Sequence, residues 1–600
     1  MKRRSDLSIE GAATTEGIPI GTEAEPEIVN GRVPIERAFI DSRVLLICLC
    51  SVVLAVLTGF IAQGLVGLIG IVTNIAFYGR FSSAFVSPAG NHRGWLVLII
   101  PAIGGLIVGV MARFGSKAIR GHGIPEAMEQ VLLNESRIPA RVTLLKPLSA
   151  AISIGTGGPF GAEGPIIATG GALGSLIGQI LHTTAGERKT LLAAGAAAGM
   201  AATFGSPVSA VLLAVELLLF EFRPRSIVPV ALASAAATAI RMLYVGTEPI
   251  FAMPALARQS GEALAAYAII GALVGWIAVY VTRAVYWIED LFEHLPIHWM
   301  WWPVLGGLVV GAIGIFAPHT LGVGYDNIEG MVNGSLAGKA VLFLCAMKFL
   351  SWSISLGSGT SGGTLAPLFT IGGGCGVILG ELGAVQFPHF GIDPRICALV
   401  GMAAMFAGAS RALLASVVFA FETTLQPMGL LPLLAGSTAG FLVSSLLMRN
   451  TIMTEKLARR GVRVPSEYAA DYLDQINVAS ACSRDVVSLR EDQRISEVHA
   501  LVPTHQGFPV VNRDGRLLGV VTRRDFIDRE PFTRVGDLIR RPPAVVFPDL
   551  SLRDAADHMV REKVGRLPVV ERADPTRVVG MLTRSDLLSA HGQRLEEEDR

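Results

Sequence analysis

The sequence predicts an all-α polytopic membrane protein followed by a soluble α/β tail. Composition is the first observation: 51% of the 600 residues are hydrophobic and the mean hydropathy is +0.53, well above the values of soluble proteins. The second is a series of long apolar stretches between residues 44 and 447. The third is a change of character after residue 449, where short strand-like and helix-like segments alternate.

The apolar stretches predict membrane helices, several of them shorter than the roughly 20 residues that a straight span needs. Glycine and proline interrupt them repeatedly, as in residues 101–109 and 357–367. Broken helices at membrane depth survive only where the freed backbone lines a cavity or is packed in protein, as in transporters built from inverted repeats. The pattern therefore favours an anion pathway over a simple helical bundle. The stretches cover residues 44–78, 95–113, 143–154, 165–182, 190–202, 207–221, 227–244, 263–286, 300–317, 339–356, 366–384, 395–408, 412–423 and 428–447.

The ends of this region predict its orientation. Residues 1–40 form a polar N-terminal segment, and the first apolar run, 44–60, is too long and too late for the core of a signal peptide, so we interpret it as the first membrane helix. Directly after the last predicted span lie the basic residues Arg449, Lys456, Arg459, Arg460 and Arg463. The positive-inside tendency then predicts cytoplasmic N- and C-termini for a multi-pass protein of the plasma (inner) membrane, surrounded by lipid.

Residues 155–170, GTGGPFGAEGPIIATG, contain a single carboxylate, Glu163, between two apolar segments. A lone acid at membrane depth predicts a functional site. Gly161 and Gly164 leave backbone N–H groups uncovered, and Pro165 suits the first turn of a helix. Bare amides at a helix start form an anion site. The alternative, that the glycines only let helices cross closely, explains the glycines but not the acid.

Composition also excludes several classes of function. A net charge of +1 without a long basic run gives no sign of a nucleic-acid partner. The six cysteines form no CxxC motif and no Cys/His cluster, so we expect neither disulfides nor a metal site. No nucleophile and base stand beside the glycine-rich loops, which argues against an enzyme. A magnesium channel would carry several intramembrane acids, whereas these loops present donors.

Three glycine-rich motifs resemble those of the CLC family of chloride channels and chloride/proton antiporters. Residues 121–125 (GHGIP) are similar to the family's GSGIP, residues 161–165 (GAEGP) to GREGP or GKEGP, and residues 363–367 (GTLAP) to GxFxP. Each motif alone is a weak signal, but the three in this order are a strong one. By resemblance, the anion-binding residues are Gly121, His122, Gly123, Ile124, Pro125, Gly161, Ala162, Gly164, Gly363, Thr364, Leu365, Ala366 and Met453.

The resemblance covers residues 41–448 and implies the CLC fold of inverted repeats with broken helices, as a homodimer with one pore per subunit. It also implies that main-chain amides bind the anion and that Glu163 is the gate, with a carboxylate that occupies an anion site and swings out when protonated. Residues 314–318 match GIFAP letter for letter, but they lie too early and lack the glycine-rich segment 357–362. We therefore assign the third motif to Gly363.

Two positions depart from the family pattern at the central anion site. His122 stands where most of the family has serine, and Met453 aligns with a tyrosine that supplies a second hydroxyl. A neutral imidazole can donate one N–H as the serine would, whereas a protonated one adds charge and pH sensitivity. The alternative for His122 is that its ring points away and bonds to a carbonyl. The exchange leaves the anion open among chloride, fluoride and nitrate.

A third departure concerns proton coupling. Antiporters of the family use the second acid of a Glu-Glu pair about ten residues after a proline, and here the two positions after Pro207 are Glu216 and Leu217. Glu216 cannot simply replace the missing acid, because one residue rotates a helix by about 100°. Its alternative role is that of a buried, hydrogen-bonded acid. The sequence thus favours a gated passive chloride channel, with a proton-coupled chloride or fluoride antiporter as the alternative.

The tail resembles a pair of CBS domains, which we predict at residues 477–530 and 531–600 after a linker of residues 449–476. Each repeat closes with a GxxTxxD run, which offers a hydroxyl and a carboxylate to a nucleotide. These residues are Thr522 and Asp525 in the first repeat and Thr583 and Asp586 in the second. The same acids are equally good N-caps of the following helix. The tail therefore either binds an adenine nucleotide or is purely structural, and the transport core requires no cofactor.

Overall fold

The computed structural model describes residues 42–462, 464, 473, 476–498 and 506–590. The predicted N-terminal segment, residues 1–40, and parts of the predicted linker lie outside them. Internal contacts divide the chain into a membrane unit, residues 40–468, and a tail unit that includes residues 469–600. The two units are described separately.

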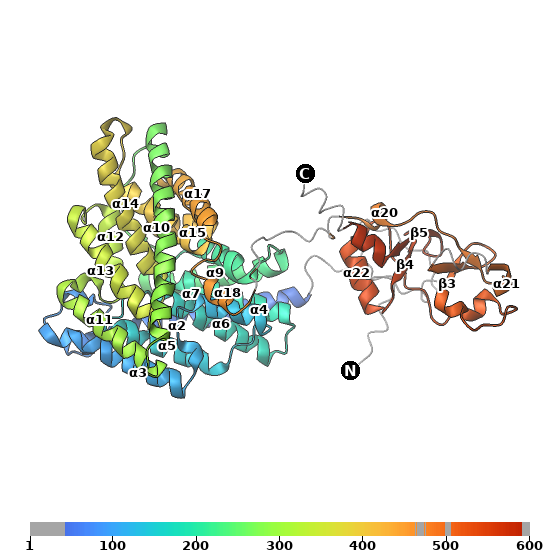
Figure 1. Cartoon of the computed structure of the whole chain (residues 1–600), viewed down its shortest axis with the longest axis horizontal. Helices are drawn as coiled ribbons and strands as arrows, with labels where there is room; N and C mark the ends of the chain where they lie inside the picture. Colours follow the sequence, from blue (N-terminus) through green and yellow to red (C-terminus); the bar gives the residue numbers. More distant parts are fainter. Residues whose placement is uncertain (1–41, 463, 465–472, 474–475, 499–505, 591–600) are drawn as a thin grey trace. The chain divides into compact units, whose positions relative to one another are not determined.

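The membrane unit is built of helices of very different lengths, the longest being α10, green in Figure 1. Its helices are α2 (Ser42–Thr73), α3 (Ile100–Phe114), α4 (Ile124–Leu133), α5 (Ala140–Gly155), α6 (Glu163–Ile180), α7 (Ala185–Phe204), α8 (Pro207–Ala214), α9 (Pro224–Val245), α10 (Gly261–Glu293), α11 (Trp302–Phe316), α12 (Tyr325–Asn333), α13 (Gly338–Gly357), α14 (Leu365–Gln386), α15 (Pro394–Ser410), α16 (Leu413–Thr424), α17 (Leu430–Leu447) and α18 (Glu455–Arg459). Single turns of π-helix lie at Asn74–Tyr78 and Val215–Leu219.

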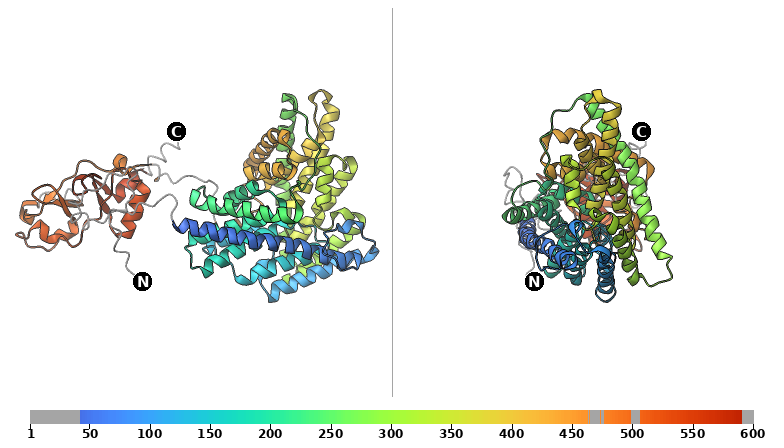
Figure 2. Two further views of the ribbon diagram at one scale, coloured as in Figure 1. Left: turned by 180° about the vertical axis from the view of Figure 1, so that it is seen from behind. Right: turned by 90° about the vertical axis from the view of Figure 1, so that its left-hand side faces the viewer.

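Length and composition allow 8 helices among the described residues to cross a membrane. The predicted short helices are also present, since α5 has 16 residues, α8 has 8 and α16 has 12. Almost every residue of α7 and α15 is buried, so these two helices form the interior of the unit. Helix α2, the long blue helix in Figure 2, packs against α7 and α9. The structure confirms the predicted fold class.

Two matching halves build the membrane unit, as close glycine contacts show. A Cβ added at Gly195 of α7 would lie 2.0 Å from the carbonyl oxygen of Gly170 on α6. In the second half, a Cβ at Gly401 of α15 would lie 2.2 Å from the carbonyl oxygen of Gly372 on α14. Each helix pair therefore crosses with its backbones in contact, a geometry that small residues permit in membrane proteins.

Two buried lysines repeat the same arrangement. Lys146 of α5 donates from Nζ to the carbonyl oxygens of Ile119 and Gly121, both at 2.8 Å. Lys348 of α13 donates to the carbonyl oxygens of Thr320 at 3.0 Å and Gly322 at 2.9 Å. Each ammonium satisfies carbonyl groups of the loop that leads into a short helix, α4 or α12. The loops before these two helices are thus fixed in equivalent ways.

The tail unit contains two small sheets. In the first, β1 (Leu489–Arg490) runs parallel to β2 (Gly507–Val511), and β2 pairs antiparallel with β3 (Leu517–Thr522). In the second, β4 (Arg566–Val570) pairs antiparallel with β5 (Val578–Thr583). The sequence pattern predicts strands within residues 507–512, 517–522, 565–570 and 578–583, and all four segments contain strands. The helices include α20 (Val478–Ala481), α21 (Ile495–Val498) and α22 (Leu552–Arg561), and residues 584–590 are also helical. The sequence also predicts a helix over residues 496–502, of which residues 499–502 lie outside the described part of the chain.

Each of the two sheets, whose strands β3, β4 and β5 are labelled in Figure 1, has its own apolar core. Phe508 and Val521 belong to the first core, and Leu567 and Leu582 to the second. Val478 of α20 packs in the second core, although it lies at the start of the predicted first repeat. The beginning of the first repeat thus packs against the second repeat, and this contact joins the two repeats into one unit.

We expect Gly195→Ala to destabilise the membrane unit, because its new methyl group would collide with a backbone carbonyl rather than with a flexible side chain. Overpacking of this kind costs about 1–3 kcal/mol of unfolding free energy. The measurement is the fraction of monodisperse protein left after heating in detergent. Gly64→Ala on α2 is the matched control, since no atom lies within 4 Å of its added Cβ. Equal heat resistance of both variants would contradict this account of the helix crossing.

Candidate functional site

The three predicted glycine-rich motifs meet in space through main-chain hydrogen bonds. Gly161 and Gly363 exchange two of them, with N to O distances of 3.3 Å and 2.9 Å. Gly121 donates to the carbonyl oxygen of Thr360 at 3.3 Å, which places it beside the lead-in to the third motif. Segments that lie more than 200 residues apart therefore form one junction inside the membrane unit.

The junction is tight enough to require glycine. A Cβ at Gly164 would lie 2.0 Å from the carbonyl oxygen of His122 and 2.9 Å from the Cα of Gly363. Gly123 has a φ of +95°, which side chains disfavour, and its Cβ would lie 2.4 Å from the carbonyl oxygen of Gly164. The sequence reading assigned these glycines to anion binding, and the structure shows that they also allow the loops to touch.

Three helices start at this junction. α6 begins at Glu163 and α14 at Leu365, and neither receives a side-chain cap, since their N-cap residues are Ala162 and Thr364. The first N–H groups of both helices are therefore available to a ligand, and the helix dipoles favour a negative one. The third helix, α4, differs because Glu126 accepts a hydrogen bond from Gly123 N at 2.7 Å. Ile124, Pro125, Leu365 and Ala366 are all buried here.

Glu163 is fully buried at the start of α6. Its Oε1 accepts a hydrogen bond from the hydroxyl of Tyr325 at 2.9 Å. Its Oε2 lies against Gly161, where an added Cβ would be only 1.6 Å away. The backbone N–H groups of Glu163 and Ala366, in the first turns of α6 and α14, are close enough to interact with the carboxylate. The carboxylate therefore lies beside the uncapped starts of both helices.

Polar atoms without partners cluster at the same place. Within the described residues, Glu163 Oε2, Thr364 Oγ1 and His122 Nδ1 are buried and make no hydrogen bond. Unsatisfied buried polar atoms are costly and need an explanation, such as a ligand or water. All three belong to predicted site residues. Water or an anion in a pathway at this place could supply the partners that the protein does not.

The loops before α4 and α18 contain His122 and Met453, the two residues that depart from the family pattern at the central anion site. Met453 is fully buried, and its backbone N donates to Thr451 Oγ1 at 3.2 Å. The following helix, α18, carries Lys456, whose Nζ lies 3.1 Å from Glu126 Oε1. Since Glu126 also binds the backbone of the His122 loop, this ion pair connects α18 to α4. Lys456, one of the basic residues after the last span, thus also stabilises the loop that contains His122.

Glu216 has the role of a helix cap. Its two carboxylate oxygens accept hydrogen bonds from Leu414 N and Ala415 N, each at 3.0 Å, at the start of α16. Glu422 of α16 does the reverse, accepting from Val208 N and Ser209 N at 2.9 Å at the start of α8. Leu217 is buried within the π-helical turn. The structure thus gives Glu216 the hydrogen-bonded role that was the alternative to proton transfer.

Sequence reasoning missed three residues that shape the site. Lys146 and Lys348 are cations within apolar stretches. A charged residue at membrane depth indicates a functional site, so the argument that selected Glu163 also applies to these lysines. Tyr325, which contacts Glu163, belongs to no motif. It follows Gly324, and nothing in its sequence context indicates that it approaches the second glycine-rich loop. Only the fold brings it there.

In the tail unit, the two predicted threonine and aspartate pairs adopt the same geometry. Asp525 Oδ2 accepts hydrogen bonds from Thr522 N at 2.8 Å and Thr522 Oγ1 at 2.7 Å. Asp586 Oδ2 accepts from Thr583 N at 2.6 Å and Thr583 Oγ1 at 2.8 Å. These bonds are those of helix caps. Of the four residues, Thr522 alone lines a cavity in the described part of the tail.

That cavity, of about 450 Å³, lies between the two repeats and is strongly basic. Its lining includes no acidic residue, and burial lowers the pKa of the Arg566 guanidinium, because the charge is removed from water. An anion bound beside Arg566 would offset that cost. The cationic residues in the lining are Arg523, Arg524, Arg541, Lys563, Arg566 and Arg584.

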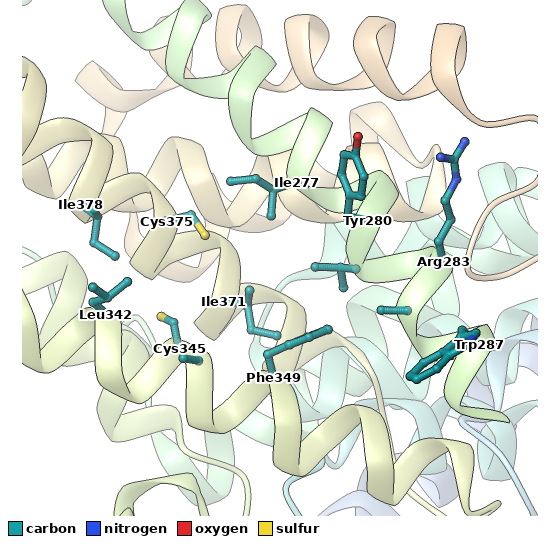
Figure 3. A pocket seen from close by; sticks show the side chains of 13 residues that line it. Ile277, Tyr280, Arg283, Trp287, Leu342, Cys345, Phe349, Ile371, Cys375 and Ile378 are labelled. Carbon is teal, nitrogen blue, oxygen red and sulfur yellow. The ribbon is translucent and has the colours of Figure 1, made fainter. Parts of the chain in front are cut away.

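A larger cavity, of about 620 Å³, lies between α10, α13 and α14 in the membrane unit (Figure 3). Its lining is almost entirely apolar, with Ile371, Phe349 and Cys345 turned towards the space between the helices. None of the predicted site residues lines it. It is therefore not the anion pathway.

Comparison with known proteins accounts for this geometry. The family model described as "Voltage gated chloride channel" matches residues 104–445, and the CBS domain model matches residues 478–531 and 535–592. The chain is 26% identical over 410 residues to the putative chloride channel protein ClcB-like of Ralstonia nicotianae, covering 66% of this chain and 96% of that protein. It is 29% identical over 357 residues to the H(+)/Cl(-) exchange transporter ClcA of Vibrio cholerae, covering 58% and 75%.

Other relatives are longer, and solved structures agree on the fold. The chain spans about half (46%) of the chloride channel protein CLC-f of Arabidopsis thaliana, to which it is 30% identical over 371 residues, or 57% of this chain. The crystal structure of a slow cyanobacterial Cl-/H+ antiporter matches with a TM-score of 0.63 at 24% identity, covering 70% of this chain and 98% of that one. The chain therefore belongs to the CLC family of anion transporters and carries a pair of CBS domains.

Proposed function

We propose that this protein exchanges chloride for protons across the membrane, with Glu163 as the gate and as the outer proton-binding group. The observation that carries the proposal is the buried Glu163 carboxylate between the uncapped starts of α6 and α14. Two names support exchange, since ClcA of Vibrio cholerae is an H(+)/Cl(-) exchange transporter and the cyanobacterial structure is that of an antiporter, whereas the relatives ClcB-like and CLC-f are named chloride channels.

The mechanism follows from competition for one site. In its ionised form, the Glu163 carboxylate lies in front of the amides that an incoming chloride would otherwise approach, so the pathway is closed. Protonation removes its charge and weakens its interaction with N–H donors, and the side chain gives way to the anion. Amides with partial charges bind an ion weakly enough to release it again, which transport requires.

A passive channel is the second candidate, and Leu217 supports it. An exchanger needs an inner group that passes protons on, and the adjacent acid, Glu216, is already engaged by two amides of α16. Chloride is the anion that the relatives' names favour. The replacement of two hydroxyl donors by His122 and Met453 keeps fluoride and nitrate as alternatives, because a changed donor set changes anion preference.

For the tail, we propose a nucleotide polyphosphate as ligand of the cavity between the repeats. Within the described part of the chain, Arg523, Arg524, Lys563, Arg566 and Arg584 make no ion pair with a carboxylate, so their charges are available to phosphates. Arginine forks recognise phosphate with two parallel bonds. The caps formed by Asp525 and Asp586 are expected to shape the cavity rather than to hold the ribose.

We further infer a homodimer in the plasma membrane with both termini in the cytoplasm. Two large apolar faces are exposed on the membrane unit, with Leu243 of α9 and Leu446 of α17 at 78% and 85% exposure. In a bilayer either lipid or a second copy covers such faces. The basic residues after α17 support the cytoplasmic orientation.

Glu163→Gln tests the gate. The amide mimics the protonated carboxyl, so we expect a higher anion flux at neutral pH and a flat pH profile. In proteoliposomes with a pH gradient, the wild-type reversal potential should depart from the chloride equilibrium value, and the variant should return to it. Wild-type flux with an unaltered pH response in Glu163→Gln would exclude this role. A wild-type reversal potential that ignores the pH gradient would favour the channel.

Glu216→Ala tests the capping role. The variant leaves two amides at the start of α16 without acceptors, and the loss of a helix cap typically costs about 0.5–2 kcal/mol of unfolding free energy. Glu216→Gln keeps a carbonyl acceptor and should lose less. The measurements are heat resistance in detergent and the ratio of proton to chloride flux. A changed flux ratio without a loss of stability would show instead that Glu216 moves protons.

Arg566→Ala tests the nucleotide site in the full-length protein. Calorimetry should show binding that tightens from AMP to ADP to ATP, because each phosphate adds contacts with the cations. The variant should bind ATP at least about tenfold more weakly, the effect expected from losing one charged hydrogen bond. Arg513→Ala, an exposed arginine that does not line the cavity, is the control. No heat with millimolar ATP would leave the tail as a scaffold.

A further inference from the structure

The hydroxyl of Tyr325 is the one side-chain donor to the Glu163 carboxylate among the described residues, at 2.9 Å from Oε1. Tyr325 is the first residue of α12, in the second half of the membrane unit, 162 residues further along the chain. The other oxygen of the carboxylate, Oε2, has no side-chain partner. Among the side chains of the described residues, Tyr325 alone thus anchors the carboxylate, and it does so at one oxygen.

The tyrosine ring is held firmly in place. It contacts Phe204 and Phe251 edge to face, with ring centroids 5.9 Å and 6.0 Å away, and stacks on Phe85 at 6.4 Å. The loop before it is fixed by Lys348, which binds the carbonyl oxygen of Gly322. A donor held by three aromatic contacts and a fixed loop cannot follow a moving carboxylate. Movement of Glu163 therefore breaks the bond.

The fold itself does not require a hydroxyl at this position. The loop before α4 contains Gly121 and Gly123, and the loop before α12 contains Gly322 and Gly324 with the same spacing and positive φ angles. The residue that follows is Ile124 in the first half and Tyr325 in the second. At the equivalent position, the first half thus has an apolar side chain. The hydroxyl of Tyr325 is therefore not needed to form this loop and helix start.

We propose that Tyr325 is a positioning residue that holds the Glu163 carboxylate in the closed position and releases it upon protonation. This inference rests on the proposed role of Glu163 as the gate. A phenol O–H bonds more strongly to an ionised carboxylate than to a neutral carboxyl. The bond thus stabilises the closed state while Glu163 is charged, and it loses most of that effect once a proton arrives.

Other groups around Glu163 act differently. Lys348 on α13 is the charged group that acts on Glu163, but its ammonium is bound to three loop carbonyls. His122, in the loop before α4, touches the start of α6 through its carbonyl oxygen. The first turn of α14 contributes backbone N–H groups and no titratable side chain. Tyr325 is therefore the group whose removal changes a direct bond to the carboxylate without adding or removing charge.

The test compares anion flux through Tyr325→Phe, Glu163→Gln and the double variant in proteoliposomes over a range of pH. Tyr325→Phe should raise flux at neutral pH by roughly tenfold, the equivalent of one charge-assisted hydrogen bond, and should reach half-maximal activation at a higher pH than the wild type. In the Glu163→Gln background, the same substitution should change flux by less than about twofold, because the amide no longer needs to be displaced as a charged group.

Tyr267→Phe is the matched control. Tyr267 lies on α10, and its hydroxyl donates to Gln259 Oε1 at 2.7 Å. The variant removes this hydroxyl and should keep the wild-type flux and pH profile. Heat resistance of each purified variant normalises flux to folded protein. If Tyr325→Phe keeps the wild-type flux and pH profile while Glu163→Gln raises the flux and flattens the profile, the role of Tyr325 is overturned and the gate role of Glu163 stands. An unresponsive Glu163→Gln would overturn the gate, and this inference with it.

Discussion

The pair of main-chain hydrogen bonds between Gly161 and Gly363 is the contact on which the membrane unit depends. At membrane depth, every backbone donor and acceptor needs a partner within the protein. Two helices that start in mid-membrane can satisfy this requirement only if the loops before them pair with each other. That pairing needs glycine, because the neighbouring atoms leave no room for a side chain. The amides that remain after the loops have paired are those that we propose as anion ligands.

The proposed anion site presents no free cation among the described residues. The two buried ammonium groups near the junction, Lys146 and Lys348, are bound to loop carbonyls and so complete the hydrogen bonding of irregular backbone. Their charge still acts through a low-dielectric surrounding, which favours an anion without a direct ion pair. A direct pair would hold the ion too strongly for rapid release. In the proposed site, the lysine charges therefore attract the anion from a distance, and main-chain amides coordinate it.

The sequence predicted much of the fold and the centre of the site, because both depend on local signals. Glycine and proline mark where helices start, and Glu163 is visible as a lone acid in an apolar setting. The bond from Tyr325 to Glu163 was not predictable, since it joins loops whose sequences carry no sign of each other. The same holds for Glu216 and Glu422, which read as isolated buried acids until α8 and α16 are side by side. In the tail, Thr522 and Asp525 were found, but the basic cavity combines arginines from both repeats.

The crossed caps of α8 and α16 impose an order on the biosynthesis of the chain. Glu216 leaves the ribosome well before its partner Ala415, from which 199 positions separate it. At roughly 5–20 residues per second, this interval lasts about 10 to 40 s. During that time the first half is in the membrane with an acid that lacks its amides and a helix start that lacks its acid. The two crossed caps can therefore form only after α16 has been synthesised.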